Sequence, residues 1–331
     1  MTLSVRTLAC LCLFLLQFVT TSVANAWDAT SHRLSIYVAW ETLSLDNRNA
    51  LHQLLQRHPR FQEDFLDQMP AAIMLATEEE QVRWLLGQAA IWPDMARGFQ
   101  GEDAIRYNRP DWHWIDGAWV RGGGIQGNIY VGTDSHPTIA GSAALPNMDE
   151  RDATNIVLAL DYNLQRLTHP LSSAAQRAVA LCWLLHLVGD IHQPLHSGAL
   201  LSSKLFASGD RGGNGIATRG GSLHAIWDEA LRSQPFEDTL QRMIATVRQT
   251  DLNIVSLDSS VWLQESRQMM HEFVYPDEIK AAVLRSERRN IPMPEFALDD
   301  DYIGRMSALS EDRVTLAGIR LSLLLQRAMS N

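Results

Sequence analysis

The chain has 331 residues, with 28 Lys and Arg against 38 Asp and Glu, so its formal net charge is −10. Only two of the basic residues are lysines, Lys204 and Lys280. This balance argues against a protein that holds nucleic acid through a broad basic surface, and any attraction for phosphate must therefore be local.

The first 26 residues have the pattern of a secretory signal peptide. Arg6 gives a short positive region, and residues 8–19 form an apolar stretch that is too short to span a bilayer. Ala24-Asn25-Ala26 then fits a cleavage site, which would make Trp27 the mature N-terminus. We therefore expect export to the periplasm or the extracellular space, with residues 27–331 as one domain.

The sequence after the predicted signal peptide offers no site for an intrachain disulfide or an N-linked glycan. Cys10 and Cys12 would leave with the signal peptide, so Cys182 would have no partner for a disulfide, and no Asn-x-Ser/Thr sequon occurs. An exported chain without disulfides or glycan sites favours a bacterial source. No later stretch reaches transmembrane length, so no stable membrane association is expected. A monomer is assumed.

Apolar residues recur with helical spacing over most of the chain, which predicts an all-α fold in a single, mostly helical domain. The predicted helical stretches are residues 34–55, 78–90, 149–167, 174–190, 225–231, 239–250, 259–273 and 312–328. Two irregular segments interrupt the pattern, because residues 117–132 are rich in glycine and residues 197–221 form a long Gly/Ser loop. Both are candidates for loops that face a substrate, and surface connectors are an equally good interpretation.

Three candidate metal ligands lie in or just after the apolar stretch 178–188. His186 and Asp190 are four residues apart, which places them on one face of a helix. Pro194 ends that helix and puts His196 into the following turn. A buried Asp beside two imidazoles is costly unless something pairs with it, and a divalent cation is the simplest partner. A single His–Asp pair more commonly forms a hydrogen bond inside a protein core than a metal site. The hypothesis of a metal site therefore depends on further ligands elsewhere in the chain.

Further candidate ligands occur at spacings and in surroundings that suit a metal site. They are His224 and Asp228, which repeat the His-x3-Asp spacing, His113 between Trp112 and Trp114, Asp94 after Trp92-Pro93, and His32 near Trp27. Taken singly, each has a structural explanation, such as a packed histidine or a helix cap. Imidazole and carboxylate without thiolate favour zinc in a catalytic site over a structural one.

Segments along the chain from Trp27 onwards resemble the zinc-dependent single-strand-specific nucleases of fungi and plants, which share their fold with bacterial zinc phospholipases C. The matching segments are residues 27–32, 92–97, 112–116, 127–132, 186–196, 209–214, 223–231, 262–266 and 317–321. The resemblance implies an all-α domain of the phospholipase C/zinc nuclease type, with irregular Gly-rich loops.

Carried over by position, the resemblance implies three Zn²⁺ ions per chain. The first would be held by Asp94, His113, His186 and Asp190. The second would take the amine and carbonyl of Trp27, together with His32 and the second oxygen of Asp190. The third would take His196, His224 and Asp228. In this scheme Asp190 bridges the two closest metals.

The resemblance also implies a secreted phosphodiesterase that hydrolyses single-stranded DNA and RNA to 5′-phosphate products, with 3′-nucleotidase activity. A water shared by the two close zincs would attack phosphorus, and the third zinc would stabilise the leaving 3′ oxygen. Arg97 would face the scissile phosphate, with a surface ion pair as the alternative. Trp114, Asp116 and Asn214 match positions that hold a nucleobase. The alternative places Trp114 in the core and Asp116 at a turn.

A zinc-dependent phospholipase C and a non-catalytic zinc-binding protein are the competing hypotheses. The phospholipases carry Glu where this chain has Asp228, and they lack the Arg97, Asp116 and Asn214 group. Mere zinc binding needs no bridged pair of ions. The chain departs from the nuclease pattern at Asp28 and Ser31, where the family usually has Gly, so we expect a slightly different backbone around the second zinc.

Overall fold

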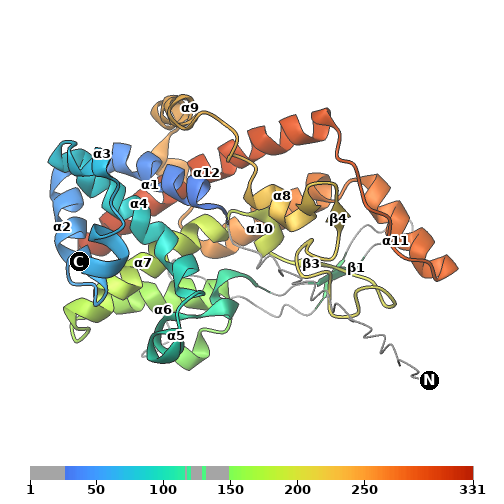
Figure 1. Ribbon diagram of the computed structural model, residues 1–331, viewed down its shortest axis with the longest axis horizontal. Helices are drawn as coiled ribbons and strands as arrows, with labels where there is room; N and C mark the ends of the chain where they lie inside the picture. The colour runs from blue at the N-terminus through green and yellow to red at the C-terminus, as the bar shows by residue number, and fades with distance from the viewer. Residues whose placement is uncertain (1–26, 116–117, 121–128, 132–148, 331) are drawn as a thin grey trace, which may run out of the picture.

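A computed structural model describes residues 27–115, 118–120, 129–131 and 149–330 (Figure 1). The predicted signal peptide and Asp116 lie outside these residues. Within them the chain is mostly helical, as the helical spacing of its apolar residues predicts, and its strands are short. None of the helices in this part of the chain is long and apolar enough to cross a membrane.

The elements follow one another as helices joined by short turns, with the strands confined to the two irregular segments. The helices are α1 (Ala29–Thr42), α2 (Leu45–Leu55), α3 (Ala71–Met74), α4 (Glu78–Ala96), α5 (Gly101–Tyr107), α6 (Ile156–Thr168), α7 (Ala174–Asp190), α8 (Leu223–Asp228), α9 (Phe236–Gln249), α10 (Ser259–Met269), α11 (Asp277–Arg289) and α12 (Asp300–Met329). The strands are β1 (Ala118–Val120), β2 (Ile129–Val131), β3 (Ala199–Leu201), β4 (Ala217–Thr218) and β5 (Gly221–Ser222). Short 3-10 turns include η2 (Pro110–His113), η3 (Glu150–Asp152), η4 (Pro194–His196) and η5 (Leu252–Ile254), and π-helical turns are η1 (Gln62–Leu66) and η6 (Met270–Val274).

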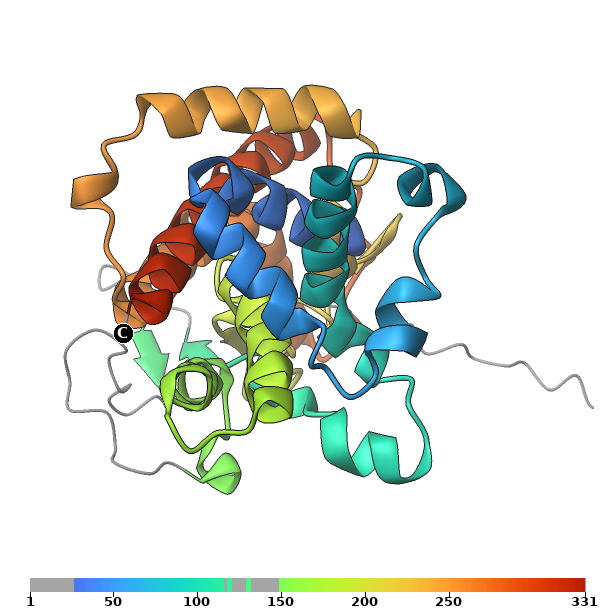
Figure 2. The ribbon, with the colours of Figure 1, turned by 90° about the vertical axis from the view of Figure 1, so that its left-hand side faces the viewer.

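Helix α7 lies in the middle of the bundle because most of its sequence is apolar. Ser173 and Gln176 form a capping box that fixes where the helix begins. Every residue from Leu181 to Asp190 is buried. Helices α4 and α6 pack against α7, and α1 packs against both α4 and α12 (Figure 2). The last ten residues of α7 therefore lie in the core, where a charged side chain needs a partner.

Helices α1 and α12 pack closely against each other at Gly318. A Cβ at this position would lie 2.6 Å from the carbonyl oxygen of Ser35 and from the Cβ of Val38. Helix α12 runs along most of the length of the molecule in Figure 1, and α9 lies across α1 and α12 in Figure 2. This packing holds the start of α1, which follows Trp27, against the body of the protein.

The structure differs from the predicted helical stretches at several ends. The stretch 34–55 is divided into α1 and α2, because Ser44 is extended and its hydroxyl accepts a hydrogen bond from the amide of Asn47 at 3.2 Å. Helix α4 continues beyond residue 90, since Trp92 and Ala96 extend its buried face. The sequence did not predict α5, α11 or the first third of α12, whose N-cap Asp299 accepts from the amide of Tyr302 at 2.8 Å.

The two irregular segments, expected as loops, contain the strands. Strand β1 pairs antiparallel with β2, with Trp119 opposite Tyr130, and parallel with β3, with Trp119 opposite Leu200. Strands β4 and β5 form a separate hairpin just before α8. The segments 117–132 and 197–221 therefore meet in one small sheet, order β2-β1-β3, and much of the first segment lies outside the described residues.

His58 is a buried histidine in an aromatic cluster. The rings of Phe65, Trp92 and Tyr107 surround it, with the Trp92 centroid 4.5 Å away. Its Nδ1 accepts a hydrogen bond from the amide of Arg60 at 3.2 Å. Burial lowers the pKa of His58 from 6.5 to about 3, so the imidazole is neutral in the folded protein.

We expect His58 to make the folded protein less stable as the pH falls. Between pH 6.5 and about 3 the unfolded chain binds a proton at His58 that the folded chain does not, so stability is lost across this window. His58→Leu removes this contribution. From pH 7 to pH 5 the unfolding free energy of the variant should gain about 2 kcal/mol relative to the natural protein. Urea denaturation of both proteins, in the presence of a metal chelator, measures their unfolding free energies at each pH. If the difference between the two unfolding free energies stays constant with pH, the prediction is contradicted.

Candidate metal centre

The C-terminal end of α7 brings three predicted ligands to one place. His186 and Asp190 lie one helical turn apart, and neither side chain is exposed to solvent. The helix ends at Asp190, and the chain then turns through residues 191–193 into η4, whose first residue is Pro194 and whose last is His196. The predicted helix stop at Pro194 thus places His196 at the end of a tight turn, where it is also buried.

One group of candidate ligands joins α4, η2 and α7. It consists of Asp94, His113 and His186, each of which offers a ligand atom within 4.8 Å of the others. His186 Nε2 lies 2.8 Å from His113 Nδ1, and Asp94 Oδ1 lies 3.8 Å from His113 Nδ1 and 3.9 Å from His186 Nε2. Ligands placed tetrahedrally at roughly 2.0–2.1 Å from a zinc ion are about 3.3 Å apart, so these separations suit a shared metal ion.

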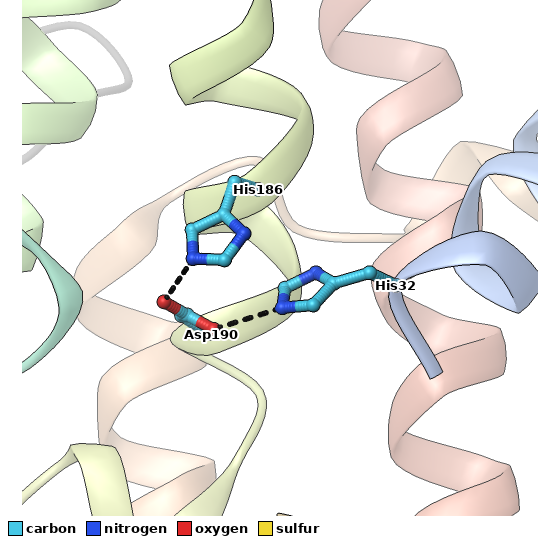
Figure 3. Close-up of side chains that lie close together, drawn as sticks. All are labelled: His32, His186 and Asp190. Carbon is cyan, nitrogen blue, oxygen red and sulfur yellow. Dashed lines mark ion pairs between the residues drawn. The ribbon is translucent and has the colours of Figure 1, made fainter. Parts of the chain in front are cut away.

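A second group adjoins the first and shares His186 with it. It adds His32 from α1 and Asp190 from α7. Asp190 Oδ1 lies 3.3 Å from His32 Nε2, whereas Oδ2 lies 2.9 Å from His186 Nε2 (Figure 3). Oδ2 also lies 3.1 Å from His113 Nδ1. The two oxygens of Asp190 therefore face different sets of nitrogens, which is the arrangement that a bridging carboxylate requires.

A third group combines the turn after α7 with α8. His224 and Asp228 repeat the one-turn spacing on α8, with His224 Nε2 3.3 Å from Asp228 Oδ2. His196 completes the group, its Nε2 lying 3.9 Å from Asp228 Oδ1. The imidazole rings of His196 and His224 stack with centroids 5.0 Å apart. All three side chains are buried.

Backbone carbonyls fix which ring nitrogen of three histidines carries the proton. The bonds run from His186 Nδ1 to Ala90 O at 2.7 Å, from His196 Nδ1 to His113 O at 2.6 Å, and from His224 Nδ1 to Gly212 O at 2.6 Å. A carbonyl oxygen only accepts, so Nδ1 is protonated and, in the neutral ring, Nε2 has a free lone pair. In each case Nε2 faces the cluster, which is the usual orientation of metal-ligating imidazoles.

Burial favours the neutral form of His32, His113, His196 and His224, whereas at His186 burial is outweighed by the charges of Asp190 and Asp94, which raise its pKa. Burial, followed by the charge of Arg97, lowers the pKa of His113 to about 3, and burial likewise lowers that of His224 to about 3. Burial raises the pKa of Asp228 well above its ordinary value. Burial also opposes ionisation of Asp190, but the neighbouring His186 and His196 outweigh it and hold its pKa well below the usual range.

Several side-chain atoms of the three groups are buried without a hydrogen-bond partner in the described part of the chain, although His32 Nε2 and Asp190 Oδ1 face each other at 3.3 Å and Asp94 Oδ1 lies 3.2 Å from Arg97 Nε. They are both ring nitrogens of His32, Asp94 Oδ1, His113 Nε2, Asp190 Oδ1 and His196 Nε2. Buried polar atoms in native proteins are almost always paired, so a concentration of unpaired ones at converging side chains indicates a ligand. A divalent metal ion satisfies nitrogen lone pairs and carboxylate oxygens together, and the residues present fit such an ion.

The segment around Trp27 is tied to α8. The amide of Asp28 donates to the carbonyl of Asp228 at 3.0 Å, and Asp28 Oδ1 caps α1 by accepting from the amide of Ser31 at 3.0 Å. Asp28 Oδ2 pairs with Arg232 Nε at 3.1 Å. Asp28 therefore links the start of the helix that carries His32 to the turn after α8, next to Trp27, which is buried.

The predicted substrate-facing residues border the cluster where they are described. Arg97 Nε lies 3.2 Å from Asp94 Oδ1, so the pair shares one side of the last turn of α4, as the spacing predicted. Trp114 has 39% of its surface exposed, which excludes the interpretation of Trp114 as a core residue. Asn214 Nδ2 donates to Arg211 O at 2.8 Å, and Ser222 Oγ, the N-cap of α8, lies 3.4 Å from Asn214 Oδ1. Asp116 lies outside the described residues.

Sequence reasoning missed Gln193, which acts at the third group. Its Nε2 donates to Asp228 Oδ1 at 2.7 Å, while its Oε1 accepts from the amide of Leu195 at 2.6 Å. This amide bridge connects the turn after α7 to the carboxylate on α8. Its position between Asp190 and His196 is the one signal in the sequence that could have drawn attention to it.

Plant proteins with related sequences cover about half of the chain. It is 33% identical over 163 residues to Endonuclease 4 of Arabidopsis thaliana, which is 46% of this chain and 51% of that protein. It is 29% identical over 186 residues to Endonuclease 5 and over 188 residues to Endonuclease 3 of the same plant, and each match covers 54% of this chain and 58% of the relative. The chain thus spans little more than half the length of these relatives.

The S1/P1 nuclease family model matches residues 27–330. The match begins at Trp27, contains every residue of the three His/Asp groups, and ends in the last helix. Because it covers nearly all of the chain, the relationship rests on the whole domain and not on a single motif. The chain belongs to the S1/P1 nuclease family.

Proposed function

We propose that this chain is a zinc-dependent nuclease that hydrolyses single-stranded DNA and RNA to 5′-phosphate products and also dephosphorylates 3′-nucleotides. The observation that carries the proposal is Asp190, whose two oxygens face different histidines in two adjoining groups, with a third group beside them. Membership of the S1/P1 nuclease family and the names of the plant endonucleases support it.

The proposed centre holds three zinc ions. Asp94, His113, His186 and Asp190 would bind the first, and His196, His224 and Asp228 the third. The second would take His32, the other oxygen of Asp190, and the amine and carbonyl of Trp27. When bound, zinc supplies a water of lowered pKa and withdraws charge from phosphate oxygens. The protein's contribution is to hold neutral imidazoles and three carboxylates in place in a buried site.

Arg97 is proposed to steer the phosphate. Its charge is close enough to lower the pKa of histidines in two groups, His113 in the first and His196 and His224 in the third. A guanidinium between these groups presents a fixed positive charge to a phosphate that contacts both. We therefore propose that Arg97 orients the scissile phosphate, with Asp94 holding the guanidinium in position.

Trp114 and Asn214, together with Asp116, are proposed to hold one nucleobase. An exposed indole directly after the ligand His113 offers a flat face beside the site of cleavage. Stacking on that face requires an unpaired base, which gives a physical reason for a preference for single strands. Amide and carboxylate groups at Asn214 and Asp116 would read the edge of the base.

Export is part of the same proposal. Residues 1–26 would be removed as a signal peptide, leaving the domain 27–331 with Trp27 at its N-terminus. Cleavage after Ala26 would then create the free amine that the second zinc uses, so secretion and metal loading would be connected.

A four-substrate assay tests the proposed activity. The protein beginning at Trp27, loaded with zinc, is offered single-stranded DNA, RNA, a 3′-nucleotide and phosphatidylcholine. We expect cleavage of both polynucleotides with 5′-phosphate ends, release of phosphate from the 3′-nucleotide, and no turnover of the lipid. Lipid hydrolysis without nucleic-acid cleavage would identify a phospholipase C instead. Zinc binding without turnover of any of the four would leave a non-catalytic zinc-binding protein.

A further inference from the structure

The turn that joins Asp190 to His196 is held by side chains that come from far along the chain. Residues 191–197 carry polar backbone atoms at the C-terminal end of α7, beyond the reach of the helix's own hydrogen bonds. Four bonds from α10 and α12 satisfy polar atoms of this turn. They run from Ser266 Oγ to Ile191 O at 2.6 Å, from Arg313 Nε to His192 O at 3.2 Å, from Arg267 Nε to Ser197 O at 2.9 Å, and from Arg320 Nη1 to His192 Nε2 at 2.8 Å.

The side chains behind the turn form a charged cluster, which we call the arginine cradle: Glu265, Ser266, Arg313 and Arg320. The Glu265 side chain is 34% exposed, whereas the other three residues are buried. Arg313 Nη1 lies 2.8 Å from Glu265 Oε2, and Arg320 reaches both Glu265 oxygens at 2.7 Å. Arg313 Nη2 also donates to Ser266 Oγ at 2.8 Å. The arginines are 5% and 3% exposed, so two positive charges and one negative charge lie beneath the turn.

His192 connects the cradle to the helix end in one defined orientation. Its Nδ1 lies 2.7 Å from the carbonyl oxygen of Val188, so Nδ1 carries the proton and Nε2 accepts from Arg320. The ring is thereby held at both nitrogens, and its carbonyl is held by Arg313. His192 is not among the candidate metal ligands, because both of its ring nitrogens have hydrogen-bond partners.

Burying an excess positive charge costs desolvation free energy. Well-packed apolar residues of similar volume often stabilise a fold as well as a buried ion pair or better, so a buried arginine cluster is poorly explained by stability alone. The effect of the arginine cradle is on the conformation of the turn, because its planar guanidinium groups hold the backbone of the turn at defined positions. The residues on that turn which face the cluster are His196 and Gln193, and both serve the third group.

We propose that Glu265, Ser266, Arg313 and Arg320 position the turn so that His196 and Gln193 meet His224 and Asp228, and that they thereby set the metal affinity of the third group. The first and second groups depend on α1, α4, η2 and the body of α7, which the cradle does not touch through these bonds. Disturbing the cradle therefore weakens one metal site selectively. The inference rests on the proposed metal centre, but its test measures metal binding and needs no nuclease activity.

Zinc titration of the metal-free protein, residues 27–331, against a competing chelator tests the proposal. In Arg313→Met we expect the affinity for one of three zinc equivalents to fall about 10–100-fold, the range for residues that orient metal ligands, while the other two stay unchanged. Arg313→Lys keeps the charge without the planar fork and should show the same selective loss. Full rescue by lysine would mean that charge and not positioning matters, and would overturn the proposal.

A milder variant keeps the test valid if Arg313→Met fails to fold. Ser266→Ala removes one neutral hydrogen bond to the turn, and we expect about a 5-fold loss at the same single equivalent. Arg242→Met is the control, because Arg242 pairs with Glu311 on the surface of α9 and α12 and contacts no part of the turn through that pair. Equal weakening of all three equivalents in the cradle variants would indicate a merely structural role. Fewer than three equivalents in the natural protein would contradict the proposed centre itself.

Discussion

Asp190→Asn is expected to release more than one equivalent of zinc and to lower turnover of single-stranded DNA by about 1000-fold or more. Asparagine has nearly the shape of aspartate, so the packing around the end of α7 should survive. It offers only one oxygen that can ligate and carries no charge. Because Oδ1 faces His32 and Oδ2 faces His186 and His113, one side loses its ligating oxygen and both sides lose the negative charge that they share.

Asp228→Asn provides the matched control for Asp190→Asn. Asp228 is also a buried carboxylate one turn after a histidine, but it belongs to the third group alone. We therefore expect Asp228→Asn to lose a single equivalent of zinc. Metal analysis of both purified variants, with circular dichroism to show that each is folded, measures the difference. A loss of one equivalent from each variant would contradict the bridging role of Asp190.

Part of the candidate site was predictable because the spacing of its residues obeys simple rules. His186 and Asp190, like His224 and Asp228, are separated by one helical turn, and α7 begins and ends at the predicted residues 174 and 190 because its cap and its apolar pattern agree. Convergence of these two pairs with Asp94, His113 and His32 could be expected only from the family resemblance, since no local pattern places distant segments together. The structure brings these seven side chains and His196 into adjoining groups.

What the sequence could not predict depends on contacts between distant segments. Helix α11 buries only Ile279, Ala282, Val283 and Ser286, so its charged sequence carried little apolar signal. The carbonyls that orient His186 and His224 belong to Ala90 and Gly212, which are 96 and 12 residues away. Arg320 reaches His192 across 128 residues. A pattern within a window of one helix contains no information about such partners.

Gly189 is the clearest case of a site residue that carries no chemistry of its own. It precedes Asp190 in α7, and a Cβ there would lie 2.8 Å from His32 Nδ1 and 3.0 Å from His32 Cε1. The His32 ring also stacks on His186 with centroids 4.1 Å apart, so it is confined on two sides. Only a residue without a side chain lets α1 bring His32 this close to Asp190.

Gly189→Ala is therefore expected to lower turnover of single-stranded DNA by about 100-fold while leaving the fold intact, since displacing a functional group by about 1 Å has an effect of that size. Gly189 is helical and is not among the glycines with positive φ, so alanine introduces no backbone strain there. In a helix alanine is normally the more stable residue, by about 0.5–1 kcal/mol. A loss of activity and of the zinc held by His32, without a loss of helix content, would then report the position of the imidazole alone.

Gly304→Ala separates this steric effect from the general consequence of replacing a helical glycine. Gly304 lies on the exposed side of α12, and nothing lies within 4 Å of a Cβ built there. We expect this variant to be as active as the natural protein and slightly more stable to heat, because only the backbone entropy term changes. Wild-type turnover and zinc content in Gly189→Ala would mean that the His32 ring can move aside without leaving its metal. The ion, and not the packing of α1 against α7, would then hold His32 in place. The geometry of the second group would in that case be set by the bound zinc.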